Sequence, residues 1–375
     1  MEFHDSYCFE PMVQTGIDLR DAASRRFDDK RPQPPPATLL MLTPPVTVPI
    51  AFVHGMLSGV QARGGSCEAF LAEVGIATEL LLQPGSRVTA DQYAALFRLL
   101  MERLDDEGLN FLSRPLRRGC LALVARSALS GSTLEVAVRR VVHTFRLLQD
   151  DVELKVIRDD ELAGISLCFN DSSCGSMRFL HELLLRVFWR LLAWLVGGRL
   201  VARRFDFAFA CPPYASSYDK VFPAPQRFDQ PVSAFWFDAE RLRDPVRRNE
   251  AALRAFLADA QKYVVLPRRT DDSIGARVRM FLPQARPAWP DLEATASALN
   301  MSTSTLQRRL ASEGTSFQSL KDSLRRDVAI VRLNTSSVAL SSLASDLGFA
   351  DKAAFQRAFK IWTGSAPGAY RKGNP

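Results

Sequence analysis

Two glutamine and arginine pairs near the end of the chain carry side chains suited to reading DNA bases. Gln307 is followed by Arg308, and Gln356 is followed by Arg357. In the major groove, a glutamine amide can form two hydrogen bonds with adenine, and an arginine guanidinium can form two with guanine. These residues therefore suggest base recognition, provided that the surrounding elements hold each pair on an exposed surface.

The first pair is predicted to lie on the second helix of a helix-turn-helix unit formed by residues 293–314. Ser302 or Thr303 can cap that helix by accepting a hydrogen bond from its first turn. The turn before it falls at Asn300, because asparagine tolerates a left-handed backbone better than most residues. The unit would thus bury one face of the helix and leave the pair outside.

The second pair is predicted to lie in a similar unit, residues 340–364. Gly348 lets the chain reverse because it has no Cβ, and Asp351 can cap the following helix. On that helix, Phe355 and Phe359 are four residues apart and therefore share a buried face.

Residues 316–334 are predicted to form one helix between the two units, since apolar residues recur at helical spacing and neither Pro nor Gly interrupts them. About 19 helical residues span roughly 28 Å. Successive major-groove faces of a duplex are roughly 34 Å apart. A rod of this length could therefore place two recognition helices on one side of DNA.

This region resembles the DNA-binding domain of the AraC/XylS family of bacterial transcription regulators, over about residues 271–375. The resemblance rests on 306-LQRRL-310, Gly314, 325-RRDVA-329, 346-DLGFADKAAFQRAFKIW-362, Gly364, Pro367 and 370-YR-371. The sequence departs from the family pattern at Asn300, where Gly is common, at Thr363, where an aromatic is usual, and at Ala366, where Ser or Thr precedes the proline.

The resemblance implies roles for individual side chains. The residues expected to contact bases are Ser304, Gln307, Arg308, Lys352, Ala353, Gln356 and Arg357. The residues expected to contact phosphates are Ser302, Thr303, Arg309, Arg325, Arg326 and Lys360. Phosphate contacts give affinity and register but no sequence information. Because Ala353 offers only an apolar contact, such as with a thymine methyl, the first unit is expected to be the more selective reader.

The distribution of charge favours a nucleic-acid partner for the end of the chain. The 375 residues carry a net charge of +7. From Gly275 onward there are 14 Lys and Arg against 7 Asp and Glu, whereas the first 274 residues hold 34 of each. The whole excess of positive charge thus lies in the region expected to bind DNA.

The preceding residues predict a mixed helical and stranded domain. Helices are expected at 50–64, 66–75, 89–108, 120–131, 132–150 and 250–263, a hairpin at 152–170, and short strands near 203–211 and 233–238. The apolar stretch 178–198 is interrupted by Arg178, His181, Glu182, Arg186 and Arg190. These polar residues share one face, so a half-buried helix is favoured over a membrane span.

This domain resembles the non-cupin α/β effector domain of the AraC/XylS branch that includes ornithine-utilisation regulators. The similarity lies in residues 130–148, in Gly197 and Gly198, and in residues 214–242. The expected fold is an α+β effector domain followed by an all-α DNA-binding domain with two helix-turn-helix units joined by a linker helix. The expected bounds are a tail at 1–36, an effector-binding and dimerisation domain at 37–263, a linker at 264–272 and a DNA-binding domain at 273–375.

Enzymatic chemistry finds little support in the sequence. Ser217 and Lys220 form an SxxK without a partner motif, and Ser166 lies in a segment that lacks the second glycine of a nucleophile elbow. No P-loop or dinucleotide fingerprint is present. The main alternative from another class of protein is a DNA-repair protein with a reactive thiol at Cys168 or Cys174.

The six cysteines include no CxxC pair, and the four histidines are scattered. We therefore expect no metal, no cofactor and no catalytic residues, and a reduced, cytoplasmic protein without a signal peptide or membrane partner. The function expected is a DNA-binding transcription regulator, as a rule an activator in this family. Its partners would be double-stranded DNA, a small-molecule effector, RNA polymerase and a second copy of the chain. The alternative is a regulator without an effector, whose N-terminal domain only dimerises.

Overall fold

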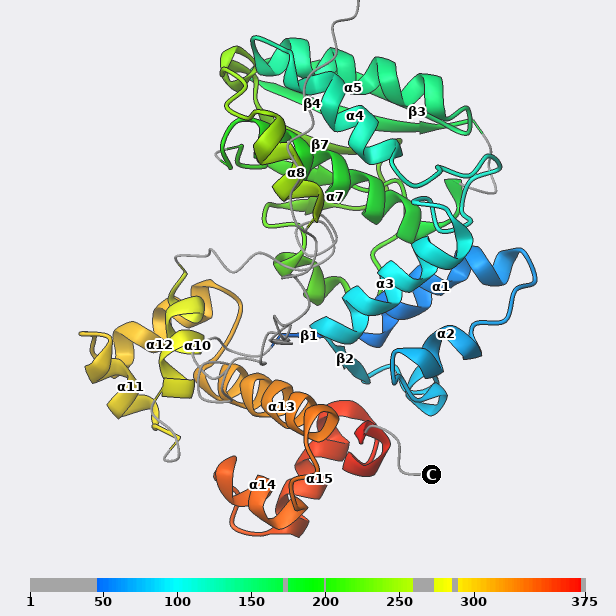
Figure 1. Ribbon diagram of the computed structural model, residues 1–375. Helices are drawn as coiled ribbons and strands as arrows, with labels where there is room; N and C mark the ends of the chain where they lie inside the picture. Colours follow the sequence, from blue (N-terminus) through cyan, green and yellow to red (C-terminus); the bar gives the residue numbers. More distant parts are fainter. Residues whose placement is uncertain (1–45, 171–174, 199, 259–272, 285–288, 372–375) are drawn as a thin grey trace, which may run out of the picture. The chain divides into compact units, whose positions relative to one another are not determined.

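The computed structural model describes residues 46–170, 175–198, 200–258, 273–284 and 289–371 (Figure 1). Contacts along the chain divide it into Met1–Leu42 and Thr43–Pro375, and all that follows concerns the second unit. The tail expected at 1–36 and the linker expected at 264–272 lie outside the described residues. Residues 46–258 are called the N-terminal region below, and residues 273–371 the C-terminal region.

The N-terminal region begins with a two-stranded antiparallel ribbon that the sequence did not predict. Strand β1 (Thr47–Pro49) pairs with β2 (Arg87–Thr89), with Thr47 opposite Thr89. Between the strands lie the helices α1 (Ile50–Ala62) and α2 (Glu68–Glu73) and the 3-10 turn η2 (Thr78–Leu82). Since each strand has only three residues, neither shows the alternation by which a strand is recognised.

Helix α3 (Ala90–Leu104) follows directly from β2. Thr89 caps it, because its side chain accepts a hydrogen bond from the Gln92 backbone while the Thr89 backbone donates one to Gln92 Oε1. Helices α4 (Cys120–Leu129) and α5 (Leu134–Leu148) then form the expected pair. The start of α3 is therefore set by a local capping signal.

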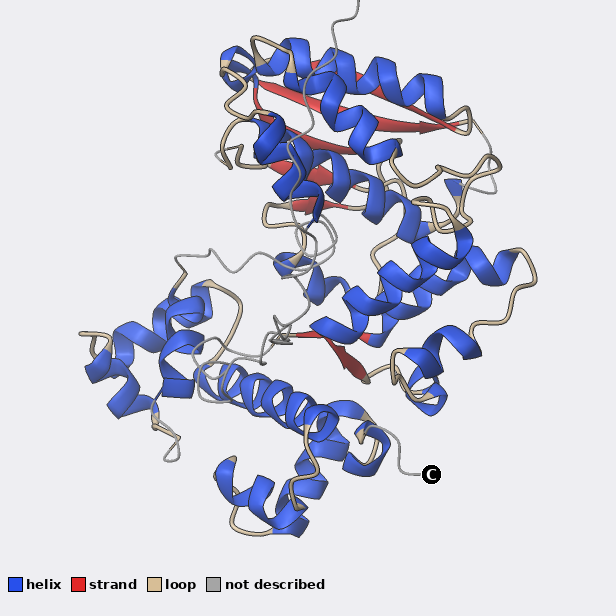
Figure 2. Cartoon of the chain, in the orientation of Figure 1, coloured by secondary structure: helices blue, strands red, loops and turns tan. Residues whose placement is uncertain are grey.

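A five-stranded sheet forms the rest of the N-terminal core (Figure 2). Its order is β3 (Val152–Asp159), β4 (Leu162–Phe169), β7 (Ser233–Asp238), β5 (Arg204–Asp206) and β6 (Gln226–Arg227). Only the β5 and β6 pair is parallel. The predicted hairpin is confirmed, since Val152 lies opposite Phe169 and Asp159 opposite Leu162. Helix α5 packs on β3.

Helix α7 (Arg178–Leu195) corrects one prediction, because His181, Glu182, Arg186 and Arg190 on its polar face are buried, while Arg178 at its start is exposed. His181 Nδ1 lies 2.7 Å from Ser233 Oγ, and Glu182 accepts a hydrogen bond from the Tyr218 hydroxyl. Burial raises the pKa of Glu182 to about 7, although the tyrosine hydrogen bonds oppose this shift. His181 and Glu182 thus find partners inside the protein rather than in solvent.

The remaining N-terminal elements are the 3-10 turns η3 (Ala215–Lys220) and η4 (Ala239–Arg243) and the helix α8 (Glu250–Ala258). The prediction for 250–263 is confirmed up to Ala258, and its last residues lie outside the described part. None of the helices that the structure describes has the length and apolar character needed to cross a membrane.

The C-terminal region is all helical. Its elements are α10 (Ile274–Gln284), α11 (Leu292–Ala298), α12 (Thr303–Ser312), α13 (Phe317–Thr335), α14 (Leu340–Asp346), α15 (Lys352–Thr363) and the short turn η5 (Pro367–Tyr370). Helix α13 joins the pair α11 and α12 to the pair α14 and α15 (Figure 1). The chain therefore combines an α+β N-terminal region with an all-α region of two helix-turn-helix units and a linker helix.

Candidate nucleic-acid interface

The first helix-turn-helix unit forms as the sequence predicts. Asp291 caps α11 by accepting a hydrogen bond from the Ala294 backbone at 2.8 Å. Asn300 adopts φ 56° in the turn, which is the left-handed conformation expected of it. Ser302, rather than Thr303, caps α12 by accepting a hydrogen bond from the Thr305 backbone at 3.2 Å. Each of these signals is local, so the sequence alone could set the unit's geometry.

Helix α12 presents a polar face to solvent. Leu306 and Leu310 have no exposed surface. Ser304, Gln307 and Arg308 are exposed. In the described part of the chain, no hydrogen bond or ion pair engages the side chains of Gln307 or Arg308. The first pair is therefore free to meet an external partner.

The second unit repeats the plan with different turn chemistry. Gly348 adopts φ 73°, and Asp351 caps α15 by accepting a hydrogen bond from the Ala354 backbone at 2.7 Å. Phe355 and Phe359 are fully buried, with ring centroids 5.6 Å apart.

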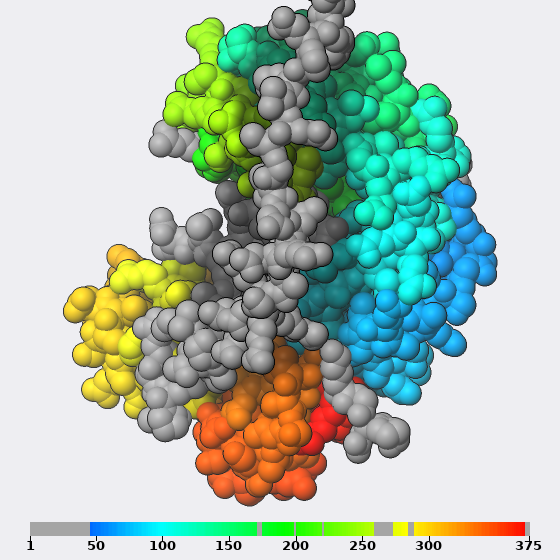
Figure 3. Space-filling model, in the orientation of Figure 1, coloured from blue at the N-terminus to red at the C-terminus, as the bar shows by residue number. Residues whose placement is uncertain are grey.

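On the opposite side of α15, Lys352, Ala353 and Arg357 are exposed, and Gln356 is half-buried. Both helix pairs reach the face of the molecule shown in Figure 3, where α11 and α12 are yellow and α14 and α15 are orange to red. The residues expected to read bases thus lie mainly on open helix faces.

The residues expected to contact phosphates divide into two groups. Ser302, Thr303, Arg309 and Lys360 are exposed. Arg325 is instead packed between two aromatic rings, 5.4 Å from the Trp289 centroid and 5.3 Å from that of Phe349.

Arg326 is also engaged within the protein. Its Nε donates to Asp327 Oδ1 at 3.2 Å, and only 19% of its side chain is exposed. Burial also lowers the pKa of Arg325, the residue packed between the two rings. The negative charge of the nearby Asp322 opposes this lowering. Arg325 and Arg326 therefore already have structural contacts through their charged groups, and phosphate binding by either stays a prediction.

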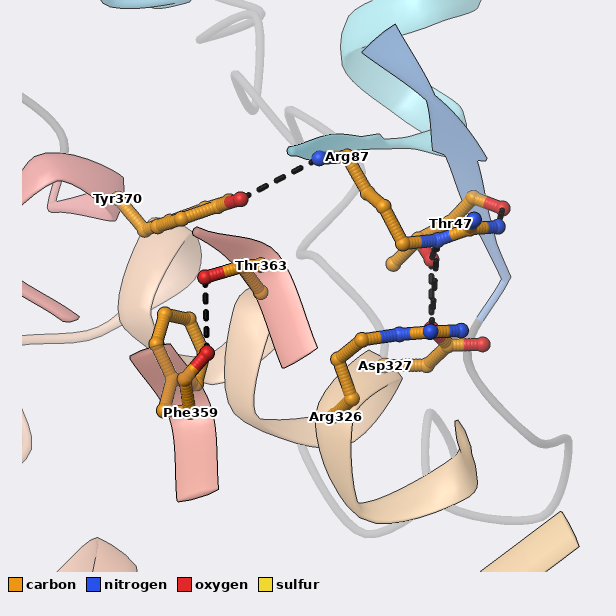
Figure 4. A network of polar contacts seen from close by, with 7 residues as sticks. All are labelled: Thr47, Arg87, Arg326, Asp327, Phe359, Thr363 and Tyr370. Carbon is orange, nitrogen blue, oxygen red and sulfur yellow. Dashed lines mark hydrogen bonds and ion pairs between the residues drawn. The ribbon is translucent and has the colours of Figure 1, made fainter. Parts of the chain in front are cut away.

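The C-terminal region is attached to the β1 and β2 ribbon through α13 (Figure 4). Thr47 Oγ1 donates a hydrogen bond of 2.6 Å to Asp327 Oδ1 and accepts one of 2.6 Å from Arg87 Nε. Arg87 Nε also lies 3.8 Å from the Asp327 carboxylate. Burial lowers the pKa of Arg87 to about 10, and Asp327 opposes this shift. A buried ion pair and a hydrogen bond thus join the ribbon to α13, and the hydrogen-bonded residues Thr47 and Asp327 are 280 positions apart.

The second helix-turn-helix unit adds further contacts to the same ribbon. The Arg87 backbone donates to Tyr370 Oη at 3.2 Å, and Ser86 Oγ donates to the Thr363 carbonyl at 3.4 Å. A Cβ on Gly85 would lie 3.2 Å from the Thr363 carbonyl carbon. Thr363 is fully buried. The turn before β2 therefore packs closely against residue 363. In this chain that residue is the small Thr363, where the family usually has an aromatic.

The cysteine alternative finds no built site in the described residues. Burial raises the pKa of the Cys67 and Cys120 thiols, which lowers their thiolate fraction. Cys168 lies in β4 opposite Glu153, and Cys174 is outside the described residues. A search of the described residues finds no group of His, Cys, Asp or Glu that could hold a metal.

Comparisons with known proteins match the two regions separately. Residues 64–246 match the family model described as the arabinose-binding domain of AraC transcription regulator, N-term, and residues 295–373 match a helix-turn-helix domain. The chain is 28% identical to the ornithine utilization regulator of Pseudomonas aeruginosa over 327 residues, which cover 87% of this chain and 96% of that protein.

Two further matches come from the same organism. The HTH-type transcriptional regulator VqsM is 30% identical over 156 residues, 41% of this chain and 48% of that protein. The crystal structure of the transcriptional regulator CdpR aligns with 88% of this chain and 99% of its own at 20% identity, with a TM-score of 0.29.

The order of the two matched regions agrees with the order of the α+β and helical parts of the fold. The matched relatives are named as regulators, and VqsM is named as a transcriptional regulator. A helix-turn-helix domain binds DNA by placing a recognition helix in the major groove. The chain belongs to the AraC/XylS family of bacterial transcription regulators.

Proposed function

We propose that this protein activates transcription by binding promoter DNA in a sequence-specific way under the control of a small-molecule effector. One observation carries the proposal. Two recognition helices have buried apolar faces and exposed polar faces, and a single helix of 19 residues joins their units. That helix spans roughly 28 Å, close to the roughly 34 Å repeat of the major groove.

The residues proposed to contact bases are those named from the sequence: Ser304, Gln307, Arg308, Lys352, Ala353, Gln356 and Arg357. Gln307 and Arg308 have the strongest support, because both side chains are exposed and engage no partner in the described part of the chain. Arg309 and Lys360 are the proposed main phosphate contacts, with Ser302 and Thr303 at the helix start. Arg325 and Arg326 would first have to leave the rings and the carboxylate that they contact.

Effector control would run through the contact between the β1 and β2 ribbon and α13. The effector-binding role belongs to the N-terminal region, which is large enough to hold a pocket as well as a dimer contact. Thr47, Arg87 and Asp327 give a change in that region a direct path to the helix that joins the two reading units. An effector that favours one arrangement of this contact would change promoter occupancy.

RNA polymerase and a second copy of the chain are the further partners that we propose, by analogy with the family. The proposed domain bounds are those expected from the sequence. Helix α8 ends at Ala258 and α10 begins at Ile274, on either side of the proposed linker at 264–272.

A reporter assay tests the activator role. Duplexes bound by the purified chain are selected from a random pool, and the selected sequence is placed upstream of a weak promoter. Expression of the chain should raise transcription from that promoter, and expression of Arg308→Ala should not. A fall in transcription would identify a repressor, and failure to select any sequence would contradict specific DNA binding.

The same assay addresses the regulator without an effector. Such a protein would activate the reporter to the same extent in every growth medium, whereas an effector-controlled protein would respond to the carbon and nitrogen source. Constant activation across media would favour an N-terminal region that only dimerises.

A further inference from the structure

A cavity of about 430 Å³ lies in the N-terminal region. Its walls come from α3, α4, α5, α7 and α8, with the loop between α3 and α4 at one edge. Protein interiors usually pack with few voids larger than a water molecule. The volume falls instead in the range of small-molecule pockets, about 300–1,000 Å³. The cavity is therefore a candidate binding site rather than an ordinary packing defect.

The lining of this cavity is mainly apolar. Phe97 from α3, Val124 from α4, Phe145 from α5 and Leu183 from α7 all contribute to it. Placing a polar group against such a wall without a hydrogen-bonding partner is unfavourable, and placing a charged group there is more so. A ligand that fills the cavity must therefore have an apolar body.

Two charged residues lie in the lining, and only one of them is available. The Glu107 carboxylate accepts hydrogen bonds from the Gly119 backbone at 2.8 Å and the Leu121 backbone at 2.7 Å. It is therefore already bound to the backbone at the start of α4. Arg118 is exposed, and in the described part of the chain no hydrogen bond or ion pair engages its guanidinium. The charge of Arg118 also acts on the nearby Glu107 and Asp105 carboxylates, but its guanidinium donors are open to a ligand head group.

We propose that this cavity is the effector site and that it takes an apolar monocarboxylate, with its hydrocarbon or aromatic body inside and its carboxylate on Arg118. The assignment rests on the proposed effector control of the protein. Guanidinium and carboxylate form two parallel hydrogen bonds, which is the strongest polar contact available at this site. A ligand with a positive head would face repulsion from Arg118.

The position of the cavity connects it to the DNA-binding part. Phe97 and Met101 line the cavity and lie on α3, whose first residue directly follows β2. Arg87 of β2 pairs with Asp327 of α13. Leu257 also lines the cavity and lies at the end of α8, the last described element before α10. A ligand that moves α3 would therefore act on the contact that holds the linker helix.

Binding to the full-length protein tests the proposal. The probes are octanoate, decanoate and 4-phenylbutyrate, with decanol as the uncharged counterpart of decanoate. Calorimetry should show one site per chain for at least one carboxylate, and the melting temperature should rise with its concentration by mass action. Failure of all three carboxylates to bind would overturn the proposal.

Two pairs of variants locate the site. Ala122 lines the cavity, whereas its neighbour Leu123 is 49% exposed and does not line it. Ala122→Trp should abolish carboxylate binding by filling the cavity, and Leu123→Trp should leave it unchanged. Arg118→Ala should weaken decanoate about tenfold without affecting decanol. Arg117→Ala is its control, since Arg117 is paired with Asp105 at 2.5 Å and does not line the cavity.

The outcomes separate this site from the proposed function. Arg118 is exposed, so its variant tests the head-group contact even if Ala122→Trp fails to fold. Carboxylate binding that survives both Ala122→Trp and Arg118→Ala would place the ligand elsewhere and overturn the proposal. Each protein is also assayed for binding to the selected DNA. Intact DNA binding without carboxylate binding removes only the cavity proposal, whereas absence of specific DNA binding by the unmodified chain removes the proposed function itself.

Discussion

The two helix-turn-helix units share one plan but differ in what holds them. The first unit is fixed from within the C-terminal region, since the Glu313 carboxylate accepts hydrogen bonds from the Ile274 and Gly275 backbones at 2.8 and 2.9 Å. In the described part of the chain, no hydrogen bond of α11 or α12 reaches β1 or β2. At the end of the second unit, the Thr363 carbonyl accepts a hydrogen bond from Ser86, and Tyr370 in the following turn η5 accepts one from the backbone of Arg87 in β2.

This difference suggests a division of labour. The first unit carries the free Gln307 and Arg308 pair and depends little on the N-terminal region. The second unit carries Ala353 on its reading face and is anchored to the ribbon that leads into α3. We infer that the first unit supplies most of the sequence selectivity, while the second passes on the state of the N-terminal region.

Removing the carboxylate at the centre of the anchor should have the largest effect. Asp327→Ala leaves the buried Arg87 guanidinium without its ion-pair partner, which should lower the free energy of unfolding by about 3–5 kcal/mol. Urea denaturation measures this change. Asp322→Ala is the matched control on the same helix, because its side chain is 32% exposed and its loss should cost less than about 1 kcal/mol. Equal effects of the two variants would show that the anchor contributes little.

Replacing the proposed base-reading arginine of each unit should show how much each unit contributes to sequence selectivity. Arg308→Ala and Arg357→Ala should each weaken binding to the selected sequence by about 1–3 kcal/mol, with little change for unrelated DNA. The division of labour predicts the larger loss for Arg308→Ala. Titration of fluorescent duplexes measures both. A larger loss for Arg357→Ala would reverse the assignment of the selective reader.

Alanine at the turn residue should destabilise the second helix-turn-helix unit more than the first. A Cβ on Gly348 would lie 3.1 Å from Arg325 Nη2 and 3.2 Å from Trp289 Cδ1, at φ 73°. Gly348→Ala should therefore cost about 1–2 kcal/mol of stability from the left-handed backbone and this crowding. Asn300→Ala should cost less, below about 1 kcal/mol, because asparagine already carries a Cβ.

Gly368→Ala is the control for both turn variants, since nothing lies within 4 Å of its added Cβ and its φ is not positive. Thermal unfolding measures all three proteins. If Gly348→Ala were as stable as Gly368→Ala, the account of the second turn would be incorrect.

The phosphate contacts should give the smallest effect on discrimination. Arg309→Ala and Lys360→Ala should weaken binding to all DNA sequences alike. Because each variant loses about one phosphate contact, the slope of log K against log salt concentration should become shallower by about 0.9. Binding titrations across a salt series measure the slope. A change that appears with the selected sequence only would mean that these residues read bases.

Local signals explain what the sequence could predict. The caps at Ser302 and Asp351, the turns at Asn300 and Gly348, and the linker helix all depend on residues within a few positions of one another. The helix ends and the exposed faces of both units follow from these signals.

Long-range contacts explain what the sequence could not predict. The pair Thr47 and Asp327 has no shared local pattern, and β1 and β2 are too short to show alternation. The contact of Arg326 with Asp327 could not be predicted either, because a solvated arginine and a paired one look alike in sequence, and phosphate binding by Arg326 stays a prediction. The polar face of α7 was expected in solvent for the same reason, since the partners of His181 and Glu182 come from distant segments. A cavity likewise depends on how whole helices pack.

Chemical footprinting on the selected DNA tests the central claim most directly. The unmodified protein should protect two stretches about one helical turn apart, about 10 base pairs centre to centre. Arg308→Ala should lose protection in one stretch and Arg357→Ala in the other. Protection of a single short stretch, or loss of the same stretch in both variants, would contradict the account of two units that read DNA separately.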